Sequence, residues 1–269
     1  MIGRLKAILK RRSLLENAVL VADRALRPLG VSLLSFTRFG VYVPSAKGET
    51  PQERFDDIAK QSVWQFGESL SGGGSELDQS APYRTCLIKF IRERRVKFMF
   101  DAPCGDLHWM RHVLDQVDIA YAGGDISPHI VELNRTRFPD LSFDVFDITK
   151  DRFPEAEVWH CRDCLFHLSY ADIRSALRNF AESDIPYALI TSHQGIVRNL
   201  DIESGGWRYL NLTRAPFNFP APEVVLKDYR PGDLPQIVGM WSRKTIARLL
   251  STDSSVCGAS PSKAEAGNS

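Results

Sequence analysis

The chain has 269 residues, of which 43% are hydrophobic, 25% charged and 10% aromatic. This composition is that of a globular protein, and it excludes a collagen, a coiled coil and a wholly disordered chain. The 34 basic and 33 acidic residues give a net charge of +1, which argues against binding nucleic acid through bulk electrostatics. The charge is uneven, because residues 1–40 hold eight basic and two acidic residues.

The cysteines and the hydropathy pattern bear on the compartment. Five cysteines are too few and too odd in number for a disulfide framework in a chain of this length, so free thiols in a reducing compartment are favoured. No apolar run is long enough to span a bilayer, and the N-terminus lacks the unbroken apolar core of a signal peptide. The sequence therefore predicts a cytoplasmic protein.

Residues 1–43 are predicted to form a basic N-terminal extension. Apolar residues recur at helical spacing over residues 3–34 and are flanked by Lys and Arg, which indicates one or two amphipathic helices. One interpretation is an interfacial helix on an anionic membrane or a protein partner, which would make the protein membrane-peripheral. The other is a solvated helix packed on the core.

Residues 44–250 are predicted to form one domain that begins with a linker over residues 44–54. Helices are expected over 51–64 and 81–95, separated by the glycine-rich stretch Glu68-Ser-Leu-Ser-Gly-Gly-Gly-Ser75. Residues 251–269 are rich in Ser, Ala and Gly without periodicity and are predicted to be a disordered tail.

Short apolar segments then alternate with helical patterns. Strands are expected over residues 96–100, 119–123, 141–145, 157–161 and 187–191, and helices over 107–117, 128–137 and 171–183. This alternation predicts an α/β, Rossmann-like, doubly wound and mostly parallel sheet.

Three successive predicted strands end in an aspartate: Asp101, Asp125 and Asp147. In an open parallel sheet, ligands bind beyond the carboxyl ends of the strands. Gly105 in the first turn allows a ligand to approach the backbone closely. Asp125 lies 20 residues after Gly105, the usual place for an acid that binds the ribose hydroxyls of a nucleoside cofactor. Asp147 and Ile148 are expected to contact its adenine.

The first turn also indicates which cofactor binds. A dinucleotide site requires three glycines in G-x-G-x-x-G, whereas this turn contains Gly105 alone, and Asp106 would repel a pyrophosphate. S-adenosylmethionine (SAM) carries an ammonium and a sulfonium, and the carboxylates of Asp101 and Asp106 suit these cations.

These segments together resemble the class I SAM-dependent methyltransferases, and in particular a bacterial group whose first motif is Asp-Ala-Pro-Cys-Gly-Asp. The resemblance rests on residues 101–106, 124–125, 146–148 and 162–167 and on the preceding stretch 68–75, although Pro103 and Leu107 stand where the family usually has glycines. It implies a seven-stranded sheet whose last two strands form an antiparallel hairpin within residues 223–241. It also implies cofactor contacts from Ser71, Gly72, Ser75, Arg84, Asp101, Ala102, Pro103, Gly105, Asp106, Trp109, Asp125, Ile126, Asp147, Ile148, Arg162, Asp163 and Cys164.

The glycines at positions 72–74 allow two interpretations. The segment is either a mobile lid whose N–H groups bind the cofactor carboxylate, with Arg84 as charge partner, or a flexible linker. The resemblance favours the first. A zinc site over residues 160–167 is disfavoured, because the adjacent His160 and Cys161 at a strand end point to opposite faces. No metal site is therefore expected.

The acceptor side of the reaction is less defined. A hydroxyl acceptor requires a base for its proton, and His193 and His167 follow the fifth and fourth predicted strands. The loop-rich residues 194–222 either cover the acceptor or form an ordinary insertion; the candidate contacts there are Trp207, Arg208, Tyr209 and Asn211.

The sequence therefore predicts a SAM-dependent methyltransferase that acts on a small molecule or a glycan, at oxygen. One alternative is an NAD-type oxidoreductase, which the missing glycines disfavour. Another is a catalytically silent binding protein with the same fold.

Overall fold

The computed structural model describes residues 22, 41–42, 46–65, 67–229 and 234–256. The amphipathic helix predicted over residues 3–34 lies outside the described residues, apart from Ala22, and so does the predicted tail beyond residue 256.

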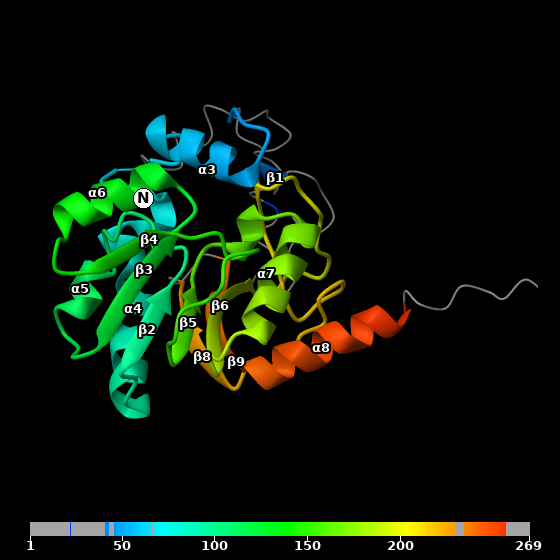
Figure 1. The fold of residues 1–269 in the computed structure, drawn as a ribbon. Helices are drawn as coiled ribbons and strands as arrows, with labels where there is room; N and C mark the ends of the chain where they lie inside the picture. The colour runs from blue at the N-terminus through cyan, green and yellow to red at the C-terminus, as the bar shows by residue number, and fades with distance from the viewer. Residues whose placement is uncertain (1–21, 23–40, 43–45, 66, 230–233, 257–269) are drawn as a thin grey trace, which may run out of the picture.

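A seven-stranded sheet forms the centre of the molecule, in the order β4-β3-β2-β5-β6-β9-β8 (Figure 1). β9 runs antiparallel to β6 and β8, and the other pairs in this sheet are parallel. The predicted Rossmann-like sheet with a final hairpin is confirmed. Its strands are β2 (Phe98–Asp101), β3 (Ala120–Asp125), β4 (Ser142–Val145), β5 (Val158–Cys161), β6 (Tyr187–His193), β8 (Val224–Lys227) and β9 (Gln236–Ser242). A separate small sheet pairs β1 (Val41–Tyr42) with β7 (Trp207–Arg208).

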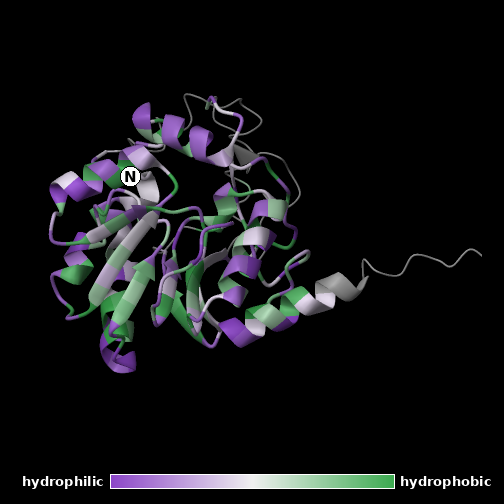
Figure 2. Cartoon of the chain, in the orientation of Figure 1, coloured by the Kyte–Doolittle hydropathy of each residue, from purple (hydrophilic) through white to green (hydrophobic). Residues whose placement is uncertain are grey.

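Helices cover both faces of the sheet. Neighbouring strand residues point to opposite faces, so each face can bury its own apolar side chains under a helix. Met99 packs with residues of α4, whereas Phe100 packs with residues of α7 and α8, so the two faces have separate hydrophobic cores. Figure 2 shows strands of pale to hydrophobic colour, and hydrophilic residues alternating with apolar ones along α3 and α6. The helices are α3 (Pro51–Lys60), α4 (Leu77–Arg94), α5 (Arg111–Leu114), α6 (Pro128–Arg137), α7 (Tyr170–Glu182) and α8 (Arg243–Val256), with 3-10 turns η4 (Gly73–Ser75) and η5 (Leu165–His167).

Several predicted boundaries are wrong. The helix expected over 107–117 is reduced to α5, and the left-handed φ of 58° at Leu107 excludes a helical start at that residue. α4 begins four residues before the expected position 81. The tail expected from residue 251 is helical as far as Val256, since α8 packs against α7 and is anchored by the buried Ile246.

α3 has a strong N-terminal signal. The Thr50 hydroxyl accepts from the Glu53 backbone N–H at 3.2 Å, and the Glu53 carboxylate accepts from the Thr50 N–H at 3.0 Å. This reciprocal capping box starts the helix directly at Pro51, a residue suited to the first helical turn. The predicted linker over 44–54 therefore ends earlier than expected.

Among the helices of the described residues, none combines the length and the apolar character that crossing a bilayer requires. The four cysteines in that part of the chain are free thiols: Cys86, Cys104, Cys161 and Cys164.

Candidate active site

A cavity lies at the carboxyl edge of the sheet, with an empty volume of about 1120 Å³ that is partly open to solvent. Residues at the ends of β2, β3 and β5 line it, as do residues of α3 and η5. Of the expected cofactor contacts, those on its wall are Ser71, Ser75, Asp101, Pro103, Gly105, Trp109, Asp125, Ile126, Asp147, Ile148, Arg162, Asp163 and Cys164.

Asp125 is held by two backbone donors at the end of β3. The N–H of Gly105 donates to Oδ2 at 3.1 Å, and the N–H of Ser127 donates to Oδ1 at 2.9 Å. Gly105 has a φ of 55°, and a Cβ there would lie 2.3 Å from the Ser71 hydroxyl oxygen, so the turn requires glycine. Burial raises the pKa of Asp125 to about 6, and the two N–H donors oppose this rise.

Asp147 follows β4 and lies on the same cavity wall. Its Oδ1 accepts from the backbone N–H of Thr149 at 2.9 Å and from the Thr149 hydroxyl at 2.6 Å. Its Oδ2 pairs with Lys150 at 3.2 Å. The structure therefore brings together Asp125 and Asp147, as the sequence predicted.

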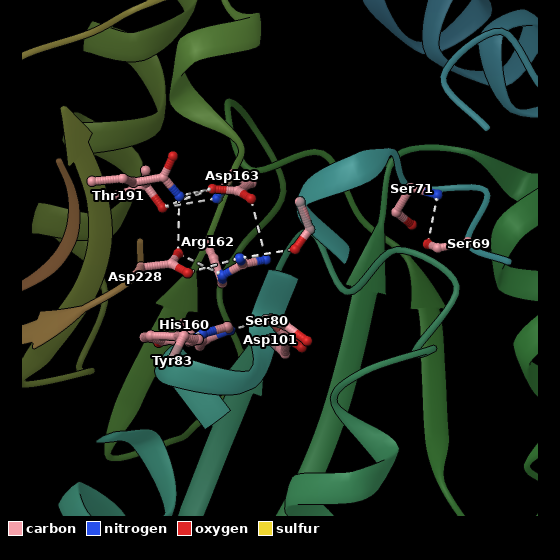
Figure 3. Close-up of polar contacts among 12 residues, drawn as sticks. Ser69, Ser71, Ser80, Tyr83, Asp101, His160, Arg162, Asp163, Thr191 and Asp228 are labelled. Atoms are coloured by element: carbon pink, nitrogen blue, oxygen red, sulfur yellow. Dashed lines mark hydrogen bonds and ion pairs between the residues drawn. The ribbon is translucent and has the colours of Figure 1, made fainter. Parts of the chain in front are cut away.

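Asp101 belongs to a buried chain of hydrogen bonds (Figure 3). The Tyr121 hydroxyl donates to Oδ2 of Asp101 at 2.8 Å, and His160 Nδ1 lies 2.6 Å from Oδ1. His160 Nε2 in turn lies 2.9 Å from the Tyr83 hydroxyl, whose pKa is raised by burial. Both oxygens of Asp101 already have partners, so this carboxylate is less available to a cationic cofactor than the sequence suggested.

Asp106 does not line the cavity and does not act as expected. Its carboxylate accepts from the hydroxyls of Ser69 at 3.0 Å and Ser71 at 3.1 Å, and from the Leu70 N–H at 2.7 Å. These donors satisfy the charge. Asp106 therefore holds residues 69–71 against the first turn. Its predicted role in cofactor binding is corrected.

The glycine-rich segment is also bonded to the body of the domain. Arg162 Nη2 donates to the Gly74 carbonyl at 3.1 Å, and a Cβ at Gly74 would lie 2.7 Å from Asp163 Oδ2. Ser71 and Ser75 line the cavity, whereas Gly72, Ala102 and Arg84 do not. Arg84 Nη2 donates to the Leu77 carbonyl at 2.9 Å, so its expected pairing with a cofactor carboxylate is corrected.

Arg162 is the centre of a buried ionic network (Figure 3). Its Nε and Nη2 donate to the two carboxylate oxygens of Asp228 at 2.8 and 3.0 Å, and Nη1 pairs with Asp163 at 3.1 Å. The guanidinium also lies 5.2 Å above the Tyr83 ring and 5.0 Å above the Trp109 ring. Burial alone would lower the pKa of Arg162, but the two aspartates outweigh it and raise the pKa.

His193 lies outside the cavity lining. The residue is 3% exposed, and its Nδ1 lies 3.2 Å from both the backbone nitrogen and the backbone oxygen of Leu210. Burial lowers its pKa to about 4. The structure does not support its predicted role as the first candidate base, because a base must reach the reacting proton.

His167, the second candidate, does line the cavity. Its Nδ1 lies 2.8 Å from the Gly206 carbonyl, so Nδ1 carries the proton and Nε2 has a free lone pair. The ring is enclosed by Trp64 at 4.3 Å and Phe166 at 4.4 Å between centroids. Burial lowers the pKa of His167 to about 3.

The cavity wall also contains residues that were not predicted from the sequence. Phe55, Ile58 and Trp64 line it, whereas the expected candidates Trp207, Arg208, Tyr209 and Asn211 do not. Arg208 donates to the Leu165 carbonyl at 3.1 Å and Asn211 donates to the Ile196 carbonyl at 2.8 Å, so both are structural. The amphipathic pattern of residues 51–60 is the feature of the sequence that could have indicated this part of the wall.

Hydrogen bonds hold α3 across the cavity. The Ser127 hydroxyl donates to Asp56 at 2.6 Å, and Gln52 donates to the Ile126 carbonyl at 3.2 Å. On the other side, Arg54 of α3 pairs with Glu203. Figure 1 shows α3 above the edge of the sheet, next to α6. α3 therefore forms a roof that spans from the end of β3 to the loop before β7.

Among the described residues, no three His, Cys, Asp or Glu side chains are grouped as metal ligation requires.

Comparisons with known proteins place the fold. No protein-family model and no curated protein matches the sequence. Among solved structures, a Burkholderia thailandensis 1,6-didemethyltoxoflavin-N1-methyltransferase has a TM-score of 0.50 at 14% identity, over 75% of this chain and 94% of that one. The magnesium protoporphyrin IX methyltransferase of Synechocystis PCC 6803 has a TM-score of 0.50 at 9% identity, over 73% and 99%. The chain has the class I methyltransferase fold.

The match to two further solved structures is partial. The chain covers 55% of the S-adenosylmethionine-dependent methyltransferase SibL and 52% of Streptomyces venezuelae DesVI.

The imidazoles of His167 and His193 should remain neutral far below the pH at which a free histidine titrates. In a nuclear magnetic resonance titration, the assigned Cε1–H signals of His167 and His193 should not shift between pH 8 and pH 5, because burial lowers their pKa values to about 3 and about 4. Free histidine, the control, titrates near ~6.5. A midpoint above pH 6 for His167 would contradict the geometry described here.

Proposed function

We propose that the protein is a SAM-dependent methyltransferase that methylates a hydroxyl of a small molecule, with His167 accepting the proton. The observation that carries this proposal is that Asp125, Asp147 and His167 line one cavity. A nucleoside site and a neutral imidazole therefore share one chamber at the carboxyl edge of the sheet.

The end of the cavity near β3 fits a nucleoside. Each oxygen of Asp125 accepts one backbone N–H and keeps a further lone pair, so together they can accept from both ribose hydroxyls. Asp147 and Ile148 line the wall beyond the next strand and suit an adenine. The single glycine of the first turn, Gly105, disfavours a dinucleotide pyrophosphate.

SAM is the nucleoside cofactor that this fold supports best. The Burkholderia enzyme was solved with S-adenosylhomocysteine (SAH), and the Synechocystis enzyme with SAM. In this chain, Ser71 and Ser75 line the cavity near the first turn, and the hydroxyl of Ser75 can bind the methionine part. SAM supplies a methyl group activated by its sulfonium, so the acceptor oxygen gains that methyl as the carbon–sulfur electron pair returns to sulfur.

The chain's own residues must orient the acceptor, exclude water and take up a proton. Nε2 of His167 accepts the hydrogen bond of the acceptor hydroxyl, because Nδ1 is already bound to Gly206. A pKa near 3 makes His167 a weak base. A weak base is sufficient, because the hydroxyl proton becomes strongly acidic as the new carbon–oxygen bond forms. The roof formed by α3 limits the access of water.

Binding of SAH tests the nucleoside site. In calorimetry, SAH should bind the wild type, and Asp125→Asn should weaken binding by roughly tenfold or more, because a charged acceptor is lost. Wild-type affinity should also fall as the pH drops below about 6, where the carboxylate becomes protonated, and this dependence should be absent in the variant. NAD is the control ligand. Tighter binding of NAD than of SAH would favour the oxidoreductase alternative.

Turnover tests the role of His167. Transfer of labelled methyl from SAM to small molecules extracted from the source cells should fall by about 10²-fold in His167→Ala, while SAH affinity stays within about twofold. His193→Asn is the matched control, since His193 lies outside the cavity, and it should retain activity. At saturating SAM, where the titration of Asp125 does not limit cofactor binding, the rate should show no inflection from His167 between pH 5 and 8. Full activity of His167→Ala would contradict the assignment, and SAH binding without any labelled product would favour a silent binding protein.

A further inference from the structure

The cavity wall outside the strand-end motifs is mostly apolar, but it also carries a carboxylate. Phe55, Ile58 and Trp64 line this part of the wall together with His167, and Asp172 of α7 is part of the same lining. A charge beside apolar side chains interacts more strongly with a ligand than a charge in open water, because little solvent screens it. The position of Asp172 therefore bears on which molecules the cavity accepts.

One loop holds Asp172 on the same side of the cavity as His167. The hydroxyl of Ser204 donates to Oδ2 of Asp172, and the backbone N–H of Gly205 donates to the His167 carbonyl at 2.9 Å. α3 packs on this loop, since a Cβ at Gly205 would lie 3.8 Å from Cδ1 of Ile58. Asp172 therefore belongs to the part of the wall that lies under α3 and carries the proposed base.

Asp172 keeps one oxygen for a ligand. Oδ2 is bound to Ser204, whereas the described residues supply neither a hydrogen bond nor an ion pair to Oδ1. Oδ1 is also absent from the buried side-chain atoms that have no partner. This oxygen is therefore accessible to solvent, on a residue that lines the cavity.

The charge of Asp172 differs from that of other carboxylates on the lining. Asp147 pairs with Lys150 at 3.2 Å, and Asp163 pairs with Arg162 at 3.1 Å. Asp172 accepts only from a neutral hydroxyl among the described residues. A ligand that fills the cavity displaces the water that solvates this carboxylate, and an unpaired buried charge is costly. A cationic group on the ligand would replace that water.

The aromatic rings on this wall suit the same kind of ligand. Phe55 and Trp64 meet edge to face, with centroids 5.8 Å apart and an interplanar angle of 69°. Aromatic faces attract cations and also pack against apolar groups. His167 does not repel a cation, because burial lowers its pKa to about 3 and keeps it neutral. These features together favour a ligand that is both apolar and positively charged.

We propose, resting on the function proposed above, that the acceptor carries a protonated amino group on an apolar body and that Asp172 binds this group. An ammonium donates three hydrogen bonds, one of which Oδ1 can accept. Asp172 takes no part in bond making, and the methyl group still goes to the acceptor's hydroxyl. Its role is to select acceptors by charge: amines are preferred to neutral alcohols, and carboxylates are repelled. A neutral glycan is disfavoured for the same reason.

Three phenols that differ in one substituent test this selection: tyramine, which is a cation, its neutral alcohol analogue tyrosol, and the anion 4-hydroxyphenylacetate. Calorimetry measures the binding of each to the wild type, with and without saturating SAH, at about pH 7, where the amine is protonated. The wild type should bind tyramine roughly tenfold more tightly than tyrosol, and should bind 4-hydroxyphenylacetate least. This comparison requires no variant.

Asp172→Asn removes the charge and keeps an oxygen that can accept from Ser204. It should weaken tyramine by roughly tenfold and leave tyrosol and SAH within about twofold. Asp201→Asn is the matched control, because Asp201 also binds the start of α7, accepting from the Tyr170 N–H at 2.8 Å, but does not line the cavity. It should change none of the affinities. Circular dichroism should confirm that both variants are folded.

The outcomes separate this inference from the proposed function. Equal affinity of the wild type for tyramine and tyrosol, or an unchanged preference for tyramine in Asp172→Asn, would overturn the inference. A loss of SAH affinity in Asp172→Asn would assign the carboxylate to the ammonium of the cofactor instead, and would also overturn it. If SAH does not bind but the preference for tyramine still depends on Asp172, the recognition of the ammonium stands and the methyl transfer function fails.

Discussion

The buried guanidinium of Arg162 connects the parts of the chain that form the site. It binds Asp228 beyond β8 through two hydrogen bonds, Asp163 through an ion pair, and the Gly74 carbonyl of η4. It also lies above the rings of Tyr83 and Trp109. A charge can be buried in this way only when its donors are paired, because an unpaired buried charge costs several kcal/mol. The arrangement therefore fixes the glycine-rich segment relative to the final hairpin.

This constraint explains why the cavity has two different ends. The glycine-rich stretch 68–75, which binds Asp106 and Arg162, closes the side of the cavity near the first turn, where the nucleoside is expected. α3 closes the cavity as a roof: Asp56 binds Ser127 at the end of β3, and Arg54 pairs with Glu203 in the loop before β7. The polar, carboxylate-bearing end and the aromatic end thus face one chamber. The methyl transfer proposed above requires such an arrangement, because donor and acceptor must meet where water is excluded.

Much of the fold could be predicted, because it depends on local pattern. The period of the strands and the glycine-containing turn after β2 suffice to place Asp101, Asp125 and Asp147 at one edge. The partners of side chains could not be predicted in this way. Asp106 has a charge that suits a cofactor, but the hydroxyls of Ser69 and Ser71 bind its carboxylate. Arg84 lies outside the cavity lining and donates to the Leu77 carbonyl. Such contacts depend on tertiary packing.

The two histidines and α3 illustrate the same limit. In the sequence, His193 and His167 both come at or after strand ends at the active edge and look equivalent. In the structure, His167 lines the cavity and binds Gly206, whereas His193 lies outside the lining and binds Leu210. The amphipathic pattern of α3 indicates that one face is buried, but not which surface covers it. In the structure that surface is the cavity. Neither the roof formed by α3 nor the place of Trp64 in the cavity wall could be predicted from the sequence.

The central claim is that one chamber holds a nucleoside methyl donor against Asp125 and an acceptor against His167. A crystal structure of the protein with SAH tests it most directly. The account predicts the ribose hydroxyls at hydrogen-bond distance, ~2.7–3.2 Å, from the Asp125 carboxylate, the adenine beside Ile148, and the sulfur facing the wall that holds His167 and Trp64. A complex in which Asp125 contacts only Gly105 and Ser127, with SAH bound elsewhere, would contradict it.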